Sequence, residues 1–353
     1  MVAAQVEKPG TQEELARVLR EADAAGHAVA PVGGGRLQAM GGVAERSDVE
    51  LHTTRLDRIV EYSPADMVVT VEAGVTLEAL QAELAKHDQF LPLDPFGSPG
   101  HTIGGILATG SSGPLRLRFG TARDFLIGIR VALPDGSLAT AGGRVVKNVS
   151  GYDLMKLHHG ALGTLGVVVA ASFKVFPKPL HDVTVESHDG WDAAARAMSL
   201  PLAPAALELL ADGRVVARFI GSRDAVNRVS ADLGWAATPG DFWSAHSRDL
   251  RMTRIAAPRA RLSEVLEGLS GWVASPAVGV AYWTPASVDA ASVRPVRAKA
   301  EAAGGSLVSL SLPPEVVREI GAWGADPPTL DVMRRIKNVF DPKHTLNPGR
   351  FVV

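Results

Sequence analysis

The sequence predicts an α+β fold of more than one domain, and three observations support this prediction. The 353 residues, 46% of them apolar, are enough to form several hydrophobic cores. Amphipathic helical stretches alternate with short runs of β-branched residues. Glycine-rich segments follow several of these runs, at Gly33-Gly34-Gly35, at residues 97–105 and at residues 160–166.

The composition excludes several classes of partner and chemistry. The formal net charge is −2 and the basic residues are dispersed, so no nucleic acid is expected as a partner. The absence of cysteine excludes disulfides, a thiolate nucleophile, cysteine-ligated iron–sulfur clusters and a cysteinyl cofactor link. The N-terminal stretch lacks the features of a signal peptide, and no window of about 18 apolar residues occurs. We therefore expect a cytoplasmic protein with no transmembrane segment.

The N-terminal part of the chain is predicted to form a βαβ-like unit followed by a small antiparallel β unit. A helix over 11–25 is expected, with Thr11 as its N-cap and Gly26 as its stop. Strands are expected where β-branched residues concentrate, and a helix follows them. The strands lie at 27–32, 49–52, 59–62 and 67–72, and the helix at 77–87.

The pattern continues to a domain boundary at Pro177 and Pro179. A loop and a short helix at 97–113 precede a long strand at 124–133. The turn Pro134-Asp135-Gly136-Ser137 leads back into a strand at 138–141. A further strand at 165–175 ends at the two prolines.

The region that follows is predicted to contain a ferredoxin-like split unit, because its elements follow a βαββα order. Its strands are expected at 183–186, 206–210 and 214–220, and its helices at 191–198 and 224–233. Later helices are expected near 259–269, 289–303 and 331–340, and no internal repeat is evident. The expected domains are 1–178, 179–330 and a C-terminal segment, 331–353.

The segment Pro31-Val32-Gly33-Gly34-Gly35-Arg36 is the first candidate binding site. Three glycines after a strand allow successive N–H groups to converge on an anion such as a pyrophosphate. The spacing matches neither G-x-G-x-x-G, since Gln38 replaces the third glycine, nor the P-loop pattern. A simple glycine-rich turn is the alternative, but the two other glycine-rich loops favour a large phosphate-bearing ligand.

Five ordered motifs carry a resemblance to a known family. They are Thr102-Ile103-Gly104-Gly105, Gly120-Thr121-Ala122-Arg123-Asp124, the block at 142–154, Gly163-Thr164-Leu165-Gly166, and Asp341-Pro342 with Asn347-Pro348-Gly349-Arg350. In these motifs the sequence resembles flavoproteins of the vanillyl-alcohol-oxidase type, which have a PCMH-type FAD-binding domain. Within that family, the block at 142–154 and the chain length are most similar to the FAD-binding E subunits of bacterial glycolate oxidases.

The resemblance implies an FAD-binding domain of two α+β subdomains, an α+β cap domain, and FAD as the cofactor. It implies FAD contacts at Gly33, Gly34, Gly35, Arg36, Leu37, Thr102, Ile103, Gly104, Gly105, Gly166, Val167 and Asn347. Members with covalent FAD place a histidine where this chain has Arg36, so FAD is expected to bind without a covalent link. Members that oxidise 2-hydroxy acids carry a histidine-rich metal and substrate motif in the cap. Residues 180–330 hold only His181, His188 and His246, none at ligand spacing, so no metal is expected.

Other polar residues have two interpretations each. Arg116, Arg118 and Lys147 are candidates to bind a substrate carboxylate, or they belong to a solvated basic face. His101 is either a flavin contact or a solvated loop histidine. The adjacent His158 and His159 are expected to be structural rather than metal ligands. No catalytic base is assigned.

The resemblance implies the function of an FAD-binding subunit in a glycolate oxidase (dehydrogenase) complex. Such a subunit would take part in the oxidation of glycolate or a related 2-hydroxy acid, beside a sibling catalytic flavoprotein subunit and an iron–sulfur subunit. Its location would be the cytoplasm, or the periphery of the inner membrane through these partners. The alternatives are a non-catalytic scaffold that keeps the FAD fold, and an independent flavin oxidase or dehydrogenase for another alcohol.

Overall fold

The computed structural model describes residues 5–97, 99–143, 153–238, 241–248 and 251–353. The chain divides into two compact units. The first comprises residues 1–111, 121–177 and 325–353, and the second comprises residues 112–120 and 178–324. No sequence feature indicated that residues 112–120 group with the second unit. The domains expected at 1–178, 179–330 and 331–353 stay a prediction.

The first unit contains a small parallel sheet with the order β1-β3-β2. Its strands are β1 (Gln5–Glu7), β2 (Val29–Val32) and β3 (Val49–His52). Helix α1 (Gln12–Ala25) connects β1 to β2. The Thr11 hydroxyl accepts the Glu14 N–H at 3.1 Å, and Gly26 ends the helix with φ +70°. Both helix signals predicted from the sequence are confirmed.

The first unit also contains a larger antiparallel sheet with the order β4-β5-β9-β7-β8. Its strands are β4 (Ile59–Ser63), β5 (Val68–Glu72), β7 (Leu126–Ala132), β8 (Leu138–Gly142) and β9 (Val167–Lys174). A separate hydrophobic core lies on each face, because neighbouring residues of β9 point to opposite sides. Val167 and Val169 pack with Leu15 and Leu19 of α1, whereas Val168 belongs to the other core.

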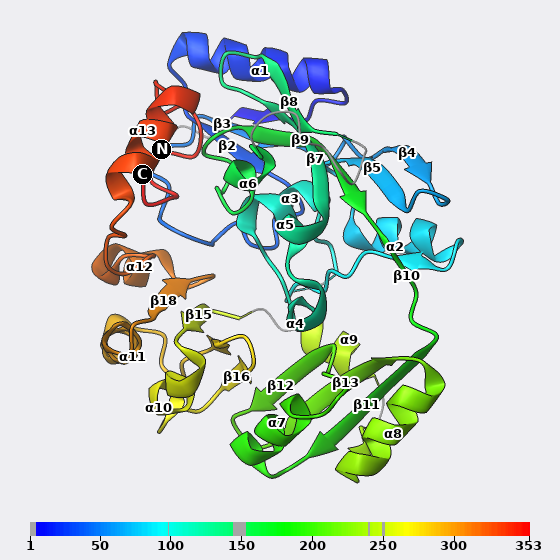
Figure 1. Cartoon of the computed structure of the whole chain (residues 1–353). Helices are drawn as coiled ribbons and strands as arrows, with labels where there is room; N and C mark the ends of the chain where they lie inside the picture. The colour runs from blue at the N-terminus through cyan, green and yellow to red at the C-terminus, as the bar shows by residue number, and fades with distance from the viewer. Residues whose placement is uncertain (1–4, 98, 144–152, 239–240, 249–250) are drawn as a thin grey trace. The chain divides into compact units, whose positions relative to one another are not determined.

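The second core is covered by α2 (Leu77–Ala85), α3 (Ile103–Thr109) and α5 (Ala122–Phe125). Figure 1 shows α1, in blue, on one side of these strands and α3 with α5 on the other. The remaining elements of this unit are β6 (Gln89–Phe90) paired with β10 (Phe176–Pro177), α6 (Met155–His158) and α13 (Leu330–Phe340). The two-residue strands and four-residue helices were not predicted, because such short elements show no periodicity.

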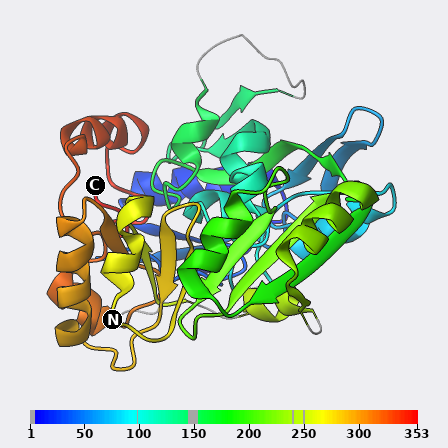
Figure 2. The same ribbon diagram turned by 60° about the horizontal axis from the view of Figure 1, so that its bottom comes forward.

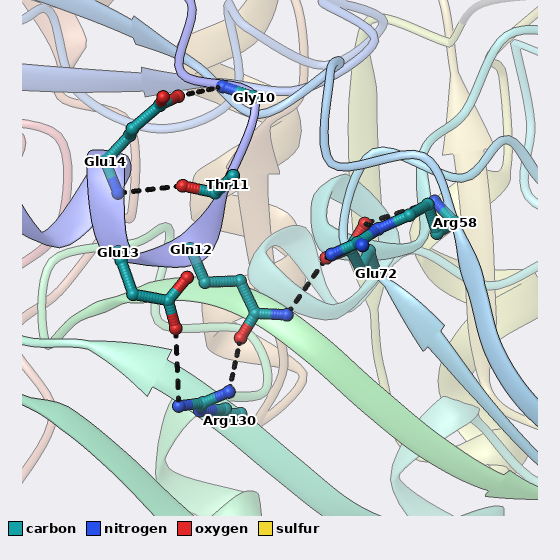
Figure 3. Close-up of polar contacts among 8 residues, drawn as sticks. All are labelled: Gly10, Thr11, Gln12, Glu13, Glu14, Arg58, Glu72 and Arg130. Atoms are coloured by element: carbon teal, nitrogen blue, oxygen red, sulfur yellow. Dashed lines mark hydrogen bonds and ion pairs between the residues drawn. The ribbon is translucent and has the colours of Figure 1, made fainter.

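A buried carboxylate ties α1 to the larger sheet (Figure 3). Glu72, at the end of β5, is fully buried and accepts hydrogen bonds from Arg58 at 2.9 and 3.0 Å and from Gln12 at 3.1 Å. Gln12 in turn accepts from Arg130 of β7 at 2.9 Å. Burial alone would raise the pKa of Glu72, but the hydrogen bonds from Arg58 and Gln12 bring it below its ordinary value. The carboxylate is therefore ionised and links three elements.

The second unit is built on an eight-stranded antiparallel sheet with the order β14-β11-β13-β12-β16-β17-β15-β18. Its strands are β11 (His181–Ser187), β12 (Ala206–Leu210), β13 (Val215–Gly221), β14 (Ala236–Ala237), β15 (Thr253–Ala256), β16 (Trp272–Ser275), β17 (Val280–Trp283) and β18 (Ser306–Ser309). Its helices are α4 (Arg116–Phe119), α7 (Gly190–Met198), α8 (Arg223–Leu233), α9 (Phe242–Arg248), α10 (Leu262–Leu266), preceded by a 3₁₀ turn at Arg259–Arg261, α11 (Ala290–Ala302) and α12 (Pro314–Ile320). Figure 2 shows α7 and α8, in green, across one face of β11, β12 and β13.

This sheet consists of two copies of one topology. β11-α7-β12-β13-α8-β14 is a complete ferredoxin-like βαββαβ unit, and β15-α10-β16-β17-α11-β18 repeats it. Read inward from the outer edges, the orders β14-β11-β13-β12 and β18-β15-β17-β16 are the same. The predicted split unit is thus present. The sequence shows no evident repeat, but the order of strands and helices does repeat. In the described part of the chain, no helix combines the length and apolarity that crossing a membrane requires.

Candidate functional site

A cleft in the first unit encloses about 720 Å³ of empty space and collects most of the predicted cofactor contacts. Three walls form it: the loop after β2, the start of α3, and a pair of segments around Leu162 and Asn347. The lining residues are Pro31, Val32, Gly33, Gly34, Gly35, Arg36, Leu37, Gln38, Thr53, His101, Thr102, Gly104, Gly105, Ala108, Thr109, Leu162, Gly163, Val167, Val168, Asn347 and Arg350.

The first wall offers unpaired backbone donors. The N–H groups of Gly35, Arg36 and Leu37 make no hydrogen bond to any residue that the structure describes. Buried or lining N–H groups normally find a partner, so three consecutive free donors indicate a ligand with several acceptor oxygens. A pyrophosphate has this chemistry, and oriented N–H groups hold it without a metal.

Glycine is required in this loop because a second loop approaches it closely. A Cβ on Gly34 would lie 2.0 Å from the carbonyl oxygen of Gly100, and one on Gly33 would lie 2.4 Å from the hydroxyl of Thr102. A Cβ on Gly35, in contrast, would meet no atom within 4 Å. Gly33 and Gly34 therefore allow the two loops to pack, whereas Gly35 faces open space.

The second wall is held mainly by its own hydrogen bonds. The N–H groups of Ile103 and Gly104 donate to the carbonyls of Val75 and Ala73 at 2.9 and 2.8 Å. The hydroxyl oxygen of Thr102 accepts from Gly34 at 3.2 Å and from Gly105 at 3.3 Å. Thr102, Gly104 and Gly105 line the cleft, but Ile103 is fully buried in the core beneath it. This wall offers a ligand the Thr102 hydroxyl and close packing more than backbone donors.

The third wall brings together residues 185 positions apart. The side-chain amide of Asn347 donates to the carbonyl of Leu162 at 2.7 Å, and its backbone N–H donates to Val29 at 2.9 Å. Leu162 and Asn347 both have positive φ, +52° and +46°, which is uncommon outside glycine and clusters at functional sites. Val167 also lines the cleft, whereas Gly166 lies behind it, against His158.

Two arginines supply positive charge to the cleft. Arg36 donates from Nε to the carbonyl of Gly97 at 3.0 Å, and Arg350 donates to the carbonyls of Gly42, at 3.0 Å, and Gln38. His101 also lines the cleft, but it is buried, and one ring nitrogen lies 2.8 Å from the Phe96 carbonyl. Burial lowers the pKa of His101, so the ring is neutral and is not a solvated loop histidine.

The other candidate residues are not brought into the cleft. Arg118 belongs to the second unit and donates to the carbonyl of Ile220 at 2.9 Å. Lys147 lies outside the described residues. His158 is buried and His159 is half-buried, and burial lowers the pKa of both, that of His158 to about 4. Within the described ranges no group of three or more potential metal-binding side chains occurs.

A polar cluster lies on the sheet of the second unit, around Tyr282 of β17. Arg254 of β15 is its direct cross-strand neighbour, and Arg116 of α4 hydrogen-bonds to it. The buried Tyr282 hydroxyl donates to the Ser112 carbonyl at 3.1 Å. Burial raises the pKa of Tyr282, which the two guanidinium groups partly offset, so the phenol stays protonated at neutral pH. The cluster therefore presents donors and positive charge.

Sequence reasoning missed Arg350, Leu162 and Gly163 as cleft residues. Arg350 closes the Asn-Pro-Gly-Arg motif, and Gly163 opens another quoted motif, so both had a local signal. Leu162 had none, because its role depends on an unusual backbone conformation. Arg254 and Tyr282 were also missed, since strand register alone makes them neighbours.

Two family models match this chain. Residues 3–152 match the family described as FAD binding domain. Residues 319–351 match the C-terminal domain of FAD linked oxidases. The first match contains the loop after β2 and the start of α3, and the second contains Asn347 and Arg350, so each wall of the cleft includes matched residues.

Curated relatives share the same region. Glycolate oxidase subunit GlcE of Escherichia coli (strain K12) is 34% identical over 190 residues, 52% of this chain and 54% of that protein. The mitochondrial D-lactate dehydrogenase [cytochrome] of Arabidopsis thaliana is 32% identical over 207 residues, 57% of this chain and 36% of that protein. The D-2-hydroxyglutarate dehydrogenase of Xanthomonas citri pv. viticola is 34% identical over 171 residues, 48% of this chain and 36% of that protein. The match thus spans about a third to a half of the relatives' length.

Solved structures of alkyldihydroxyacetonephosphate synthase, in two crystal forms, have the same fold. Their TM-scores are 0.70 and 0.71 at 18% and 16% sequence identity, and they cover 97% of this chain and 76% of theirs. The free N–H donors and the two arginines suit a dinucleotide pyrophosphate. The chain has the PCMH-type FAD-binding fold, its residues 319–351 match the C-terminal domain of FAD linked oxidases, and its cofactor is FAD.

Proposed function

We propose that this chain is the FAD-binding subunit of an oxidoreductase complex that converts glycolate or a related 2-hydroxy acid to the 2-oxo acid. The observation that carries the proposal is the chemistry shared by three relatives. Their names refer to glycolate, D-lactate and D-2-hydroxyglutarate, all of which carry a hydroxyl next to a carboxylate. We therefore propose a 2-hydroxy acid as the class of substrate, and glycolate as a candidate within that class.

The polar cluster of the second unit supports a carboxylate substrate. Arg116 and Arg254 present two guanidinium groups beside Tyr282, and guanidinium pairs well with carboxylates. The single O–H of Tyr282 is donated to the Ser112 carbonyl, so the two guanidinium groups supply the donors for the acid. We propose that this cluster, rather than Arg118 and Lys147, binds the acid group. We assign no catalytic base.

The division of chemical labour follows from these residues. When bound, FAD supplies the two-electron acceptor for the hydrogen that leaves the hydroxyl-bearing carbon. The N–H groups of Gly35, Arg36 and Leu37 hold the pyrophosphate, and Arg36 and Arg350 offset its charge. Arg116 and Arg254 of the second unit would bind the carboxylate of the acid.

Anaerobic reduction of the bound flavin tests this proposal. The protein co-expressed and purified with its proposed partner subunits is mixed with glycolate, the two lactate enantiomers, D-2-hydroxyglutarate and a simple alcohol, and the flavin absorbance is followed. Bleaching by a 2-hydroxy acid but not by the alcohol supports the proposal. Bleaching by the alcohol alone favours an independent alcohol oxidase or dehydrogenase.

We further propose that FAD is held without a covalent bond. The position used for a histidyl link in the resembling flavoproteins is Arg36, and the chain has no cysteine. Acid precipitation should release all of the flavin into the supernatant. Yellow fluorescence retained on the denatured polypeptide in a gel contradicts this proposal.

We propose a sibling flavoprotein subunit and an iron–sulfur subunit as partners, in the cytoplasm or at the inner membrane through them. The resemblance to the E subunits supports this, as does the match to the GlcE subunit. The isolated chain is then expected to turn over glycolate poorly, and co-expression with the partners should restore dye reduction. Steady turnover by the isolated chain points to a self-sufficient enzyme. A complex whose activity survives loss of FAD from this chain points to a scaffold.

A further inference from the structure

A buried lysine stands behind the third wall of the cleft. Lys337, on α13, is 1% exposed, and its ammonium group donates three hydrogen bonds. The acceptors are the carbonyl of Thr164 at 2.8 Å, the carbonyl of Leu346 at 3.1 Å and the carboxylate of Asp341 at 2.6 Å. All three donors of the ammonium group are therefore used within the first unit.

Asp341 completes the arrangement from the other side. It is fully buried, and its two oxygens accept the N–H groups of Thr345 and Leu346 at 2.9 and 2.8 Å. The carboxylate therefore fixes the turn that leads into Asn347, while Lys337 neutralises its charge. An uncompensated buried charge is costly, so the two residues depend on each other.

The two carbonyls bound by Lys337 belong to different parts of the cleft wall. Thr164 directly follows Gly163, which lines the cleft, and Leu346 directly precedes Asn347, which also lines it. Neither Lys337 nor Asp341 lines the cleft. Desolvation lowers the pKa of Lys337, but the hydrogen bond and charge of Asp341 oppose that shift. The ion pair is thus a cross-link between two wall segments that are distant in sequence.

We propose that Lys337 and Asp341 are positioning residues for FAD: they set the spacing between the 162–164 and 346–347 segments and so determine cofactor affinity. This inference rests on FAD as the cofactor and is independent of the substrate proposed above. It extends the site to two residues that do not line the cleft. It also explains why the C-terminal segment is needed for a site whose main loops lie near the N-terminus.

The test compares two lysine-to-methionine variants. Lys337→Met removes the cross-link, and Lys343→Met is the matched control, because Lys343 is exposed and pairs only with Asp23, at 2.7 Å. FAD affinity of each apoprotein is measured by quenching of flavin fluorescence, and apoprotein stability by urea unfolding. We expect Lys337→Met to weaken FAD binding about ten- to a hundredfold, because two wall carbonyls lose their donor. Lys343→Met should bind as the unsubstituted chain does.

A merely structural role has a different signature. It lowers the urea midpoint of apo Lys337→Met but leaves the dissociation constant of the folded protein within about twofold of the original. That result overturns the proposal. The variant Lys337→Gln, which keeps two side-chain donors, should recover part of the affinity, and an equal loss in both variants also contradicts the proposal.

A second measurement decides the question if Lys337→Met does not fold. Hydrogen exchange of the unsubstituted protein is recorded with and without FAD. If the cross-link and the cofactor stabilise each other, FAD slows exchange at the Thr345 and Leu346 amides about tenfold or more. Amides of α8, in the second unit, are the internal control. Unchanged exchange at Thr345 and Leu346 at saturating FAD overturns the proposal.

Discussion

The FAD cleft of the first unit and the polar cluster of the second unit are built from different parts of the chain. The cleft presents backbone N–H groups, such as those of Gly35 and Leu37, and depends on missing Cβ atoms. The cluster presents side chains, Arg116, Arg254 and Tyr282, on a regular sheet. A backbone site should tolerate many changes of side chain but no added carbon at its contact points. A side-chain site should be sensitive to a change of those side chains and tolerate an added carbon elsewhere on the backbone.

The largest expected effect on ligand binding is that of Gly34→Ala on the backbone site. The new Cβ would lie 2.0 Å from the Gly100 carbonyl oxygen, so the two loops must separate. FAD affinity is expected to fall about a hundredfold, equivalent to about 2.7 kcal/mol. Equilibrium dialysis of the apoprotein against FAD measures this loss. Gly221→Ala is the control, because its Cβ would meet nothing closer than 3.9 Å.

The reason for this effect differs from the one that the sequence suggested. The sequence suggested that the glycines let successive N–H groups converge on a pyrophosphate, whereas Gly34 lies against the second loop. If Gly34→Ala retains stoichiometric FAD, the backbone account of the cleft is wrong.

The side-chain site is tested by Arg254→Met. Loss of a guanidinium should weaken binding of the acid about ten- to a hundredfold and leave the FAD content unchanged. The measurement is the perturbation of the flavin spectrum by oxalate or glycolate. Arg294→Met is the control, since Arg294 pairs with Glu319 on the surface at 2.9 Å. Equal acid binding by both variants removes the cluster from the proposed substrate site.

The stability of the first unit at acid pH tests the contribution of His158, which lies against Gly166 behind the cleft. Burial lowers the pKa of His158 from 6.5 to about 4, so between these values the unfolded chain binds a proton that the folded protein does not. The folded state therefore loses stability as pH falls through this window, by about 3 kcal/mol in total. Urea midpoints at about pH 7.5 and about pH 4.5 measure the loss. His158→Leu should flatten this dependence, and His27→Leu, at an exposed position, should not.

The smallest expected effect belongs to Glu72→Gln. The amide keeps the shape but loses the charge that Arg58 and Gln12 bind, which should cost about 1–2 kcal/mol of stability at neutral pH. Because the pKa of Glu72 is lowered, its contribution is complete at neutral pH and disappears as pH falls through that pKa. Thermal unfolding measures the change. Glu264→Gln, which breaks an exposed pair with Arg261, should lower the unfolding temperature less than Glu72→Gln does.

Local signals account for what the sequence predicted well. The caps Thr11 and Gly26 mark α1, and β3 has the predicted bounds, 49–52. The glycine loop at 33–35 was recognised because glycines that permit close approach are adjacent in sequence. Of the twelve residues predicted to contact FAD, ten line the cleft, all except Ile103 and Gly166.

Long-range geometry accounts for what was missed. Ile103 directly follows Thr102, which lines the cleft, but the Ile103 side chain points into the core. This is because successive side chains of a helix point in different directions. The contact between Arg350 and Gln38 joins positions 312 apart. Arg254 and Tyr282 are neighbours because of the strand register. The two halves of the second unit have the same topology without an evident repeat of residues. None of these has a signature within a short window.

The duplication also has a consequence for how the second unit folds. Its two halves join through β12 and β16, which are paired at only two positions, Leu209 with Ala274 and Leu210 with Val273. The hydrogen bond between Ser275 and Glu208, at 2.5 Å, reinforces this seam. Within each half, β11 and β13 pair over seven positions, and β15 and β17 over four. A sheet with one short ladder between longer ones divides into two cooperative folding units, each able to open while the other stays intact.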